Sequence, residues 1–316
     1  MQFRTQIPIL KTDHQIDYHS KIVSLGSCFA VNMGEKLDYY KFRNTTNPFG
    51  ILFHPLALEK FLYYALSQRR FTEADIFYHN ERWHCFDAHS DLSHPDKEVL
   101  LNSLNSAVLN TYKQLKQASH LIITLGTSWV YTHLESGDLV ANCHKVSQKQ
   151  FSKGLLSAAV IKESLSTIIQ EVLEFNPSLH IIFTVSPVRH IKDGFTENQW
   201  SKSNLISALH DTLNNQETNC SYFPSYEIMM DELRDYRFYA EDMIHPNSIA
   251  IDYIWERFTE AWISAENLAT MKEVYSIQKG LEHRSFNPDS QQHQEFIAKL
   301  KQKIAVLQQQ YPHIIF

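Results

Sequence analysis

Apolar residues gather in three short runs along the chain. They are KIVSLG at 21–26, HLIITLG at 120–126 and HIIFTVSP at 180–187. Each run is nearly continuous in apolar content, rich in β-branched residues and stopped by Gly or Pro, which is typical of a strand buried on both faces. A further short strand is predicted at 220–226.

Between these runs the apolar residues recur with the period of a helix. Such segments lie at 102–118, 154–175, 201–215 and 247–266, and a helix-like run also opens at Cys28. The alternation of strand and helix predicts an α/β fold, with a doubly wound, flavodoxin-like and mostly parallel sheet flanked by helices. In such folds, functional sites lie outside the carboxyl ends of the strands.

Two segments break this alternation. Residues 71–99 are polar and aromatic, and we interpret them as an insertion or short hairpin beside the site. Near the C-terminus, apolar residues recur at 3-4-3-4 spacing, at Ile297, Leu300, Ile304, Leu307 and Tyr311. This spacing predicts a helix whose apolar stripe either docks on its own domain or contacts a second copy in a homodimer. We therefore expect a domain at 1–262 and a C-terminal helical extension at 263–316.

The composition is that of a globular protein, because 43% of the 316 residues are hydrophobic and the formal net charge is only −6. Without a basic stripe, we expect no binding to nucleic acid and no charge-based attachment to a membrane. No apolar run approaches the roughly 20 residues of a membrane span. The N-terminal residues lack the long apolar core of a secretory signal, so we expect a cytoplasmic protein.

Neither the cysteines nor the histidines form a metal-binding motif. No CxxC spacing joins the cysteines, which we expect to be free thiols: Cys28, Cys85, Cys143 and Cys220. Four histidines repeat every five positions, a spacing that suits neither a helix face nor a strand face: His79, His84, His89 and His94. The chain also lacks a Gly-rich phosphate loop. We therefore expect no metal and no cofactor.

The first predicted strand is followed by two residues with nucleophilic side chains. Gly26 permits a tight turn, and two possible nucleophiles, Ser27 and Cys28, follow it at the start of a predicted helix. The free N–H groups and positive end of a helix lower the pKa of a thiol placed there. The alternative interpretation of these three residues is a structural turn with a buried cysteine.

A second group lies just before the last long helix of the predicted sheet domain. Asp242 and His245 are three residues apart, a loop spacing that lets an imidazole base meet an orienting carboxylate. The alternative is a plain helix start, with Asn247 or Ser248 as the cap.

The motifs around these groups resemble those of a known family. The string GSCFA at 26–30 is followed, in order, by NPFGILFHP (47–55), TLGTSWVY (124–131), TVSPVRH (184–190) and YFPSYEI (222–228). This set closely resembles the GSCFA-domain family. The order nucleophile, Asp, His, with DxxHP near the end of an α/β domain, is also similar to the SGNH or GDSL hydrolase superfamily, in which a strand ends in Gly-Asp-Ser and the Ser attacks.

The resemblance implies a role for each residue. Cys28 takes the position of the nucleophile and Ser27 that of the superfamily's Asp, while His245 would be the base and Asp242 its orienting partner. The superfamily's oxyanion-hole Asn aligns with Ser128, in a block that begins at Gly126. Its oxyanion-hole Gly falls in NPFG, where Asn47 or Gly50 would serve, and the N–H of Cys28 would be a further donor.

Three other residues are weaker candidates for substrate binding. Arg189 and His190 follow the third strand and are expected to face the same crevice, where Arg189 would bind an anionic group or form a structural ion pair. His89 lies in a loop that would close over the site or remain in solvent.

The resemblance implies an esterase or O-acyltransferase that works through a covalent acyl-enzyme on an ester of a sugar or other small polar molecule. Two alternatives stay open. One is a catalytically silent ligand-binding protein on the same fold, and the other is an enzyme in which Ser27 attacks instead of Cys28.

Overall fold

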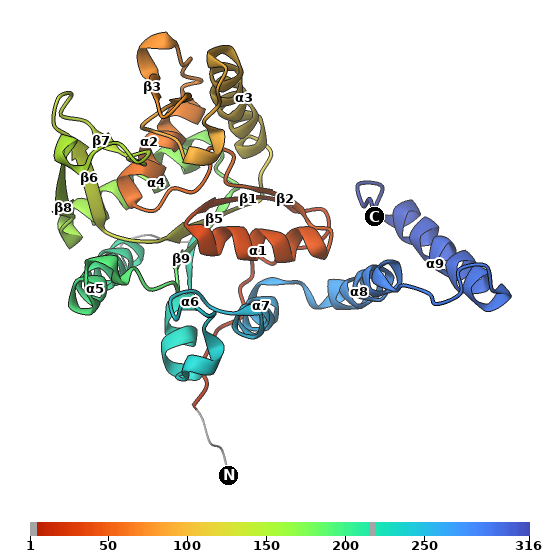
Figure 1. Ribbon diagram of the computed structural model, residues 1–316. Helices are drawn as coiled ribbons and strands as arrows, with labels where there is room; N and C mark the ends of the chain where they lie inside the picture. The colour runs from red at the N-terminus through yellow and green to blue at the C-terminus, as the bar shows by residue number, and fades with distance from the viewer. Residues whose placement is uncertain (1–4, 215–218) are drawn as a thin grey trace.

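The structure is a computed structural model that describes residues 5–214 and 219–316. Its centre is a five-stranded parallel sheet in the order β10-β9-β5-β1-β2 (Figure 1). The strands are β1 (Lys21–Gly26), β2 (Arg43–Thr46), β5 (His120–Leu125), β9 (His180–Val185) and β10 (Cys220–Phe223). This is the flavodoxin-like strand order, and it confirms the predicted α/β fold.

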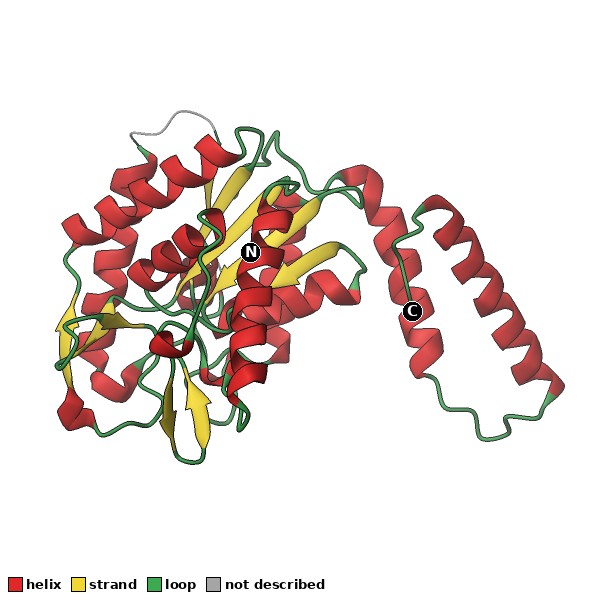
Figure 2. Cartoon of the chain, turned by 90° about the horizontal axis from the view of Figure 1, so that it is seen from above, coloured by secondary structure: helices red, strands yellow, loops and turns green. Residues whose placement is uncertain are grey.

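Helices cover both faces of this sheet (Figures 1 and 2). One face carries α2 (Pro55–Leu66), α3 (Lys97–Leu115), α4 (Ala158–Phe175) and α5 (Phe195–Leu213). The other carries α1 (Cys28–Tyr39) and α7 (Ser248–Trp262), while α6 (Ser225–Glu227) and a π-helical turn (Ile228–Glu232) follow β10. Side chains alternate along each strand, so Leu121 and Ile123 belong to one core and Ile122 to the other.

Two antiparallel additions lie outside the main sheet (Figure 2). The hairpin of β3 (Phe77–His79) and β4 (Arg82–His84) confirms a hairpin within 71–99. The other addition is a three-stranded sheet of β6 (Trp129–His133), β7 (Leu139–Val140) and β8 (Phe151–Leu155). The sequence pattern did not predict this sheet, because its partly exposed strands contain no continuous apolar run.

Two helices begin earlier than the apolar periodicity predicted, whereas α4 begins later, at Ala158 rather than at residue 154. Helix α3 begins at Lys97 because the Asp96 carboxylate accepts the N–H groups of Glu98 and Val99. Helix α5 begins after Gly194, whose φ of 121° few other residues adopt. Residue 215, the last of the helix predicted at 201–215, lies outside the described residues.

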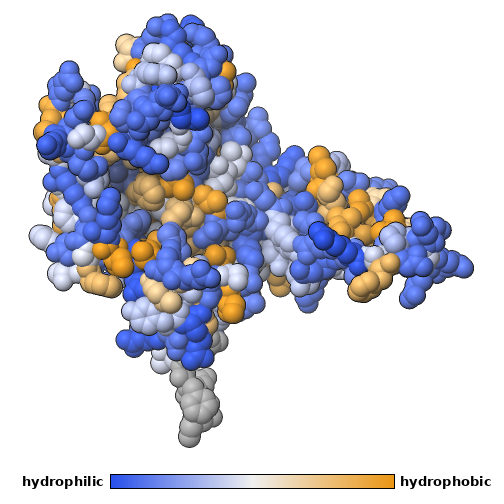
Figure 3. Space-filling view, viewed as in Figure 1, coloured by the Kyte–Doolittle hydropathy of each residue, from blue (hydrophilic) through white to orange (hydrophobic). Residues whose placement is uncertain are grey.

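The C-terminal helices α8 (Leu268–Glu282) and α9 (Gln291–Gln310) lie side by side and extend from one side of the α/β body (Figures 1 and 2). Figure 3 shows hydrophobic side chains on this arm as well as near the middle of the body. Leu300, Leu307 and Tyr311 are buried within the chain, and the Tyr311 ring lies 4.9 Å from that of Tyr18. The predicted apolar stripe is therefore largely covered by its own chain.

Candidate functional site

The β1–α1 junction lies at the carboxyl edge of the sheet, between β1 and β5. This is the point at which the strand order reverses and where ligands bind in open α/β sheets. Gly26 has a φ of 134°, and a Cβ there would lie 2.1 Å from the carbonyl oxygen of Thr124. Only glycine fits this turn, which delivers Cys28 to the first position of α1.

Ser27 and Cys28 have different surroundings. Ser27 is fully buried as the N-cap of α1, and its hydroxyl oxygen accepts the N–H of Phe29 at 3.3 Å. Cys28 is only partly buried. Its own N–H belongs to the first turn of the helix, where no helical carbonyl accepts it. The geometry therefore favours Cys28 over Ser27 as the accessible nucleophile.

The thiol of Cys28 is subject to opposing influences. Burial raises the pKa of Cys28, and this effect outweighs the Lys202 ammonium and the N–H groups of Cys28 and Phe29, which lower it. The charge of Asp242 raises it further. The prediction that the helix start lowers the pKa of this thiol is therefore wrong in its net sign.

Asp242 and His245 form the pair that the sequence predicted. The Nδ1 atom of His245 lies 2.6 Å from Oδ2 of Asp242. The backbone N–H groups of His245 and Ile244 donate to Oδ1, and together with the imidazole they lower the pKa of Asp242 to about 2. Since Nδ1 is held by the carboxylate, Nε2 is the ring nitrogen left for a proton transfer.

Arg189 fixes the loop that carries this pair. Its guanidinium donates a hydrogen bond to the carbonyl of Met243 and lies 4.3 Å from the ring centroid of Tyr239. Its backbone N–H donates to the carbonyl of Ile244 at 3.3 Å. Arg189 forms no ion pair among the described residues, so the ion-pair alternative is not supported, and its contacts with the loop are made to carbonyls and aromatic rings.

Two basic residues, the half-buried His190 and the fully buried Lys202, lie near the site. Burial, then the charges of Lys202 and His245, lower the pKa of His190 to about 3. Lys202 of α5 is fully buried, and its ammonium donates to the carbonyls of Gly126 and Ser186 at 2.7 Å each. Sequence reasoning missed Lys202. The available signal was its place on the helical stripe that includes Leu205 and Leu209.

Most of the predicted oxyanion donors are already engaged. The N–H of Gly126 donates to the carbonyl of Phe53, and the N–H of Gly50 to that of Asn47, at 2.8 Å each. The hydroxyl of Ser128 donates to the carbonyl of Ser201 at 2.9 Å in a fully buried position. This geometry does not support Ser128 as an oxyanion donor.

Asn47 is the exception among these donors. Its Oδ1 accepts the N–H of Gly26 at 2.8 Å, which ties it to the turn before Cys28. Its Nδ2 is buried without a hydrogen-bond partner. His89 lies against the same loop, where a Cβ on Gly50 would meet the Cβ of His89 at 2.2 Å. An unpaired buried donor beside the nucleophile is the feature expected of a site that awaits an anion.

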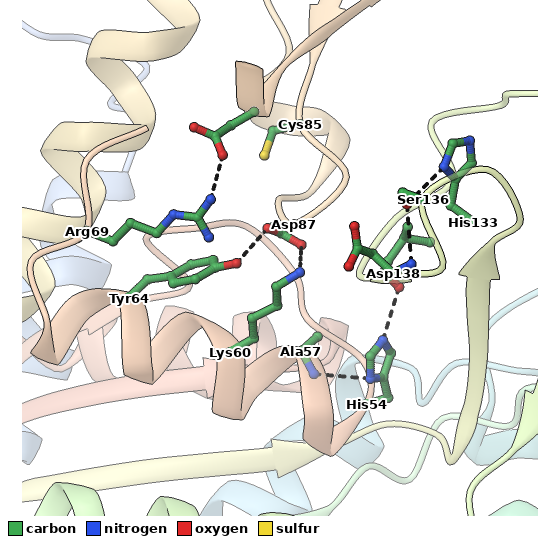
Figure 4. Close-up of polar contacts among 12 residues, drawn as sticks. His54, Ala57, Lys60, Tyr64, Arg69, Cys85, Asp87, His133, Ser136 and Asp138 are labelled. Atoms are coloured by element: carbon green, nitrogen blue, oxygen red, sulfur yellow. Dashed lines mark hydrogen bonds and ion pairs between the residues drawn. The ribbon is translucent and has the colours of Figure 1, made fainter. Parts of the chain in front are cut away.

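A second polar cluster lies between α2 and the two antiparallel additions (Figure 4). We call it the Asp87 cluster, and its members are Lys60, Tyr64, Arg69, Asp75 and Asp87. Asp87 accepts from Lys60 at 2.6 Å and from Tyr64 at 2.9 Å, and Arg69 pairs with Asp75 at 2.5 Å. The cluster lines two cavities of about 390 and 430 Å³. The positive and negative side chains of the cluster are thus paired with one another.

Three further properties of residues 5–214 and 219–316 bear on the class of protein. All four cysteines are free thiols. No group of three or more His, Cys, Asp or Glu side chains there is arranged to hold a metal ion. Within the same residues, no helix has the length and apolar content needed to span a bilayer.

The fold and this site define an α/β protein with a cysteine and an Asp–His pair at the carboxyl edge of a parallel sheet. A model of the GSCFA family matches residues 21–258, so the chain belongs to the GSCFA family. A second model, that of the C-terminal domain of GSCFA domain proteins, matches residues 274–316. No curated protein shows significant similarity to this chain.

Proposed function

We propose that this protein is an acyl hydrolase or O-acyltransferase of the SGNH superfamily, with Cys28 as nucleophile. The observation that carries the proposal is a preformed Asp–His pair whose carboxylate lies near enough to Cys28 to raise the pKa of its thiol. The pair is hydrogen-bonded at 2.6 Å, and the charge of Asp242 acts on the thiol. The proposed substrate is an ester of a sugar or other small polar molecule, by analogy with the superfamily.

The proposed reaction has two balanced halves. Nε2 of His245 takes the proton of Cys28 as Sγ attacks the ester carbonyl carbon, and the alcohol leaves with that proton while a thioester forms. Water, or a second hydroxyl in a transferase, then gives its proton to Nε2 and attacks the thioester, and the proton returns to Sγ. In the described residues the thiol and the imidazole share no hydrogen bond. The attack geometry would therefore form when a substrate enters.

The tetrahedral intermediate needs donors for its oxyanion. Two groups are suited to this role, namely the N–H of Cys28 at the start of α1 and Nδ2 of Asn47. Asp242, ionised above a pKa of about 2, keeps His245 oriented and stabilises the imidazolium.

A ligand-binding protein without catalysis is the second candidate. Two observations favour it, since burial raises the pKa of Cys28 and the N–H groups of Gly50 and Gly126 are engaged within the protein. Such a protein would bind an ester without turning it over.

Hydrolysis of p-nitrophenyl acetate by the wild type, Cys28→Ala, Ser27→Ala and His245→Ala tests the proposal. We expect loss of activity in Cys28→Ala and His245→Ala, and retained activity in Ser27→Ala, with some loss of stability because Ser27 caps α1. Activity that survives in Cys28→Ala but not in Ser27→Ala would assign the attack to Ser27. Absence of turnover in the wild type would favour the binding protein.

Three inferences from the sequence stay predictions. They are the division of domains at residues 262 and 263, a homodimer through α9 and a cytoplasmic location. Light scattering on purified protein tests the second, and fractionation of cells tests the third.

A further inference from the structure

Two buried histidines outside the Cys28 site meet ring to ring. Nδ1 of His84, on β4, lies 3.2 Å from Nδ1 of His144, in the loop between β7 and β8. Both side chains are buried, and their ring centroids are 4.7 Å apart. The contact spans 60 residues of sequence. Spacing along the chain did not reveal it, because only one of the two rings belongs to the series of histidines at every fifth position.

Hydrogen bonds on the far side of each ring determine which nitrogen carries the proton. Nε2 of His84 lies 3.0 Å from the carbonyl oxygen of His79, and Nε2 of His144 lies 2.6 Å from that of Cys85. A carbonyl oxygen can only accept a hydrogen bond, so both rings carry a proton on Nε2. In a neutral imidazole, Nδ1 then holds a lone pair. The two Nδ1 lone pairs therefore face each other.

A cation between the two Nδ1 atoms would remove the repulsion between these lone pairs. Burial lowers the pKa of both rings, that of His144 to about 4, so both imidazoles are neutral near pH 7. Metal ions bind histidine in this neutral form. Two buried, neutral and convergent imidazole nitrogens are therefore suited to a metal ion.

Two neutral oxygen atoms lie beside the pair. Oγ of Ser90 is 3.1 Å from Nδ1 of His144, and Oδ1 of Asn142 is 3.4 Å from that Oγ. Asn142 is held in place, because its Oδ1 also accepts the N–H of His144 at 2.8 Å. Ser90 and Asn142 are only partly buried, which leaves a way in from solvent.

The spacing of these atoms fits a tetrahedral metal site. Zn²⁺ binds histidine nitrogen at about 2.0–2.1 Å, so two ligands of a tetrahedral ion lie about 3.3–3.4 Å apart, whereas neighbouring square-planar ligands would lie about 2.9 Å apart. The distances of 3.2, 3.1 and 3.4 Å fit the tetrahedral arrangement better. The carbonyl on each Nε2 is also the outer partner that orients a metal-binding imidazole.

We propose that Nδ1 of His84 and of His144, with Oγ of Ser90 and Oδ1 of Asn142, form a structural Zn²⁺ site. Only two of the four ligands are histidines, and the other two are neutral oxygens. The ligands come from β4, from the turn that follows it and from the loop between β7 and β8, so the ion would hold the two antiparallel additions together. The site does not depend on the proposed acyl chemistry.

Zn²⁺ titrations of the metal-free, 316-residue chain by isothermal calorimetry test the proposal. All proteins carry Cys28→Ala, which removes the partly buried thiol of the candidate site as a competing ligand. His84→Asn and His144→Asn each remove one imidazole, and Asn tolerates the φ of 48° at position 144. His94→Asn is the matched control, because His94 belongs to the same spaced series and Asn keeps an acceptor for the N–H of Asp96.

We expect one Zn²⁺ per chain when the pair is intact, and binding weaker by about 100-fold or more in either pair variant, since loss of an outer partner alone costs about 10- to 100-fold. Zn²⁺ should raise the Tm of the intact pair and of His94→Asn, but not of the two pair variants. Ca²⁺ and Mg²⁺, which prefer oxygen ligands, should not bind there. Absence of Zn²⁺ binding by the intact pair, or binding unchanged in both folded pair variants, would overturn the proposal.

Imidazole ¹⁵N resonances keep the proposal testable if the pair variants do not fold. In the metal-free protein with the pair intact, we expect a protonated Nε2 and a lone pair on Nδ1 in both rings near pH 7. Added Zn²⁺ should move the two Nδ1 resonances and leave both Nε2 atoms protonated. A proton on either Nδ1 before Zn²⁺ is added, or Zn²⁺ that acts only on other histidines, would contradict the site.

Discussion

The Cys28 site and the Asp87 cluster are both rich in polar side chains, yet they are built in opposite ways. In the Asp87 cluster, Lys60 and Tyr64 converge on one carboxylate, and Arg69 has a carboxylate of its own. Around Cys28, in contrast, Lys202 has no carboxylate partner among the described residues, and Nδ2 of Asn47 is buried without a partner.

This difference separates structure from function. Buried polar groups cost free energy unless they are paired, and unpaired buried atoms also occur elsewhere, at Gln114 and Trp262 for example; the one at Asn47 is distinct in its place beside a candidate nucleophile, where a ligand could complete the pairing. The Asp87 cluster has more charged side chains, but they are paired with one another, which argues for a structural role. The unpaired groups near Cys28 argue for a site, and four substitutions test this contrast.

Cys28→Ala has the largest expected effect. It should lower esterase turnover by about 10³-fold or more, because removing the nucleophile leaves only binding and the oxyanion donors. Steady-state hydrolysis of p-nitrophenyl acetate measures the loss. Asp87→Asn should leave turnover unchanged. A comparable loss of turnover in that variant would contradict the assignment of a structural role to the Asp87 cluster.

Asn47→Ala should have the next largest effect. Loss of an oxyanion donor lowers kcat by about 10²-fold, whereas Ser128→Ala should change it by no more than about twofold. Ser128 is the matched control, because its buried hydroxyl donates to the carbonyl of Ser201 rather than facing the site. Equal effects of the two substitutions on kcat would remove Asn47 from the proposed mechanism.

His54, beside the Asp87 cluster, should make stability depend on pH. Its Nδ1 accepts the N–H of Ala57 at 3.1 Å, which requires a neutral ring, and burial lowers the pKa of His54 from 6.5 to about 4. Below pH 6.5 His54 is protonated in the unfolded chain, whereas in the folded chain it stays neutral until about pH 4. The free energy of unfolding therefore falls as the pH drops through this window. The contribution of His54 is about 3 kcal/mol at most.

Urea unfolding at several pH values measures this effect. His54→Asn keeps a cap for α2 and should flatten the dependence between pH 6.5 and pH 4. His283→Asn, at an exposed position, is the control and should leave the slope unchanged. An unaltered slope in His54→Asn would show that other groups govern acid sensitivity.

Asp87→Ala should have the smallest effect on free energy and none on chemistry. It leaves Lys60 and Tyr64 without their acceptor, and we expect a loss of stability of about 1–3 kcal/mol. Urea unfolding measures the loss, and turnover per folded molecule should equal that of the wild type. Lost turnover at full stability would give the cluster a functional role.

The sequence predicted the sheet better than its surroundings. The strands β1, β5 and β9 are buried on both faces and therefore read as apolar runs. The edge strand β2, with the sequence RNTT, carries no such pattern. Its place in the sheet depends on pairing with β1, which local periodicity does not reveal.

The site divides in the same way. The turn at Gly26 and the Asp242–His245 pair are local features, so adjacent residues were enough to predict them. Lys202 and the engagement of Ser128 depend on contacts between distant segments. The net rise in the pKa of Cys28 depends on how much of the fold covers the thiol, which spacing alone does not give.

The most direct test of the central claim is the intact mass of the protein after brief exposure to p-nitrophenyl acetate near neutral pH, with peptide mapping of any adduct. We expect one acetyl group, on the peptide bearing Cys28 and located on its sulfur, that is absent in His245→Ala. An acetyl group on Ser27, or a Cys28 no more reactive than Cys85 or Cys143, would contradict it.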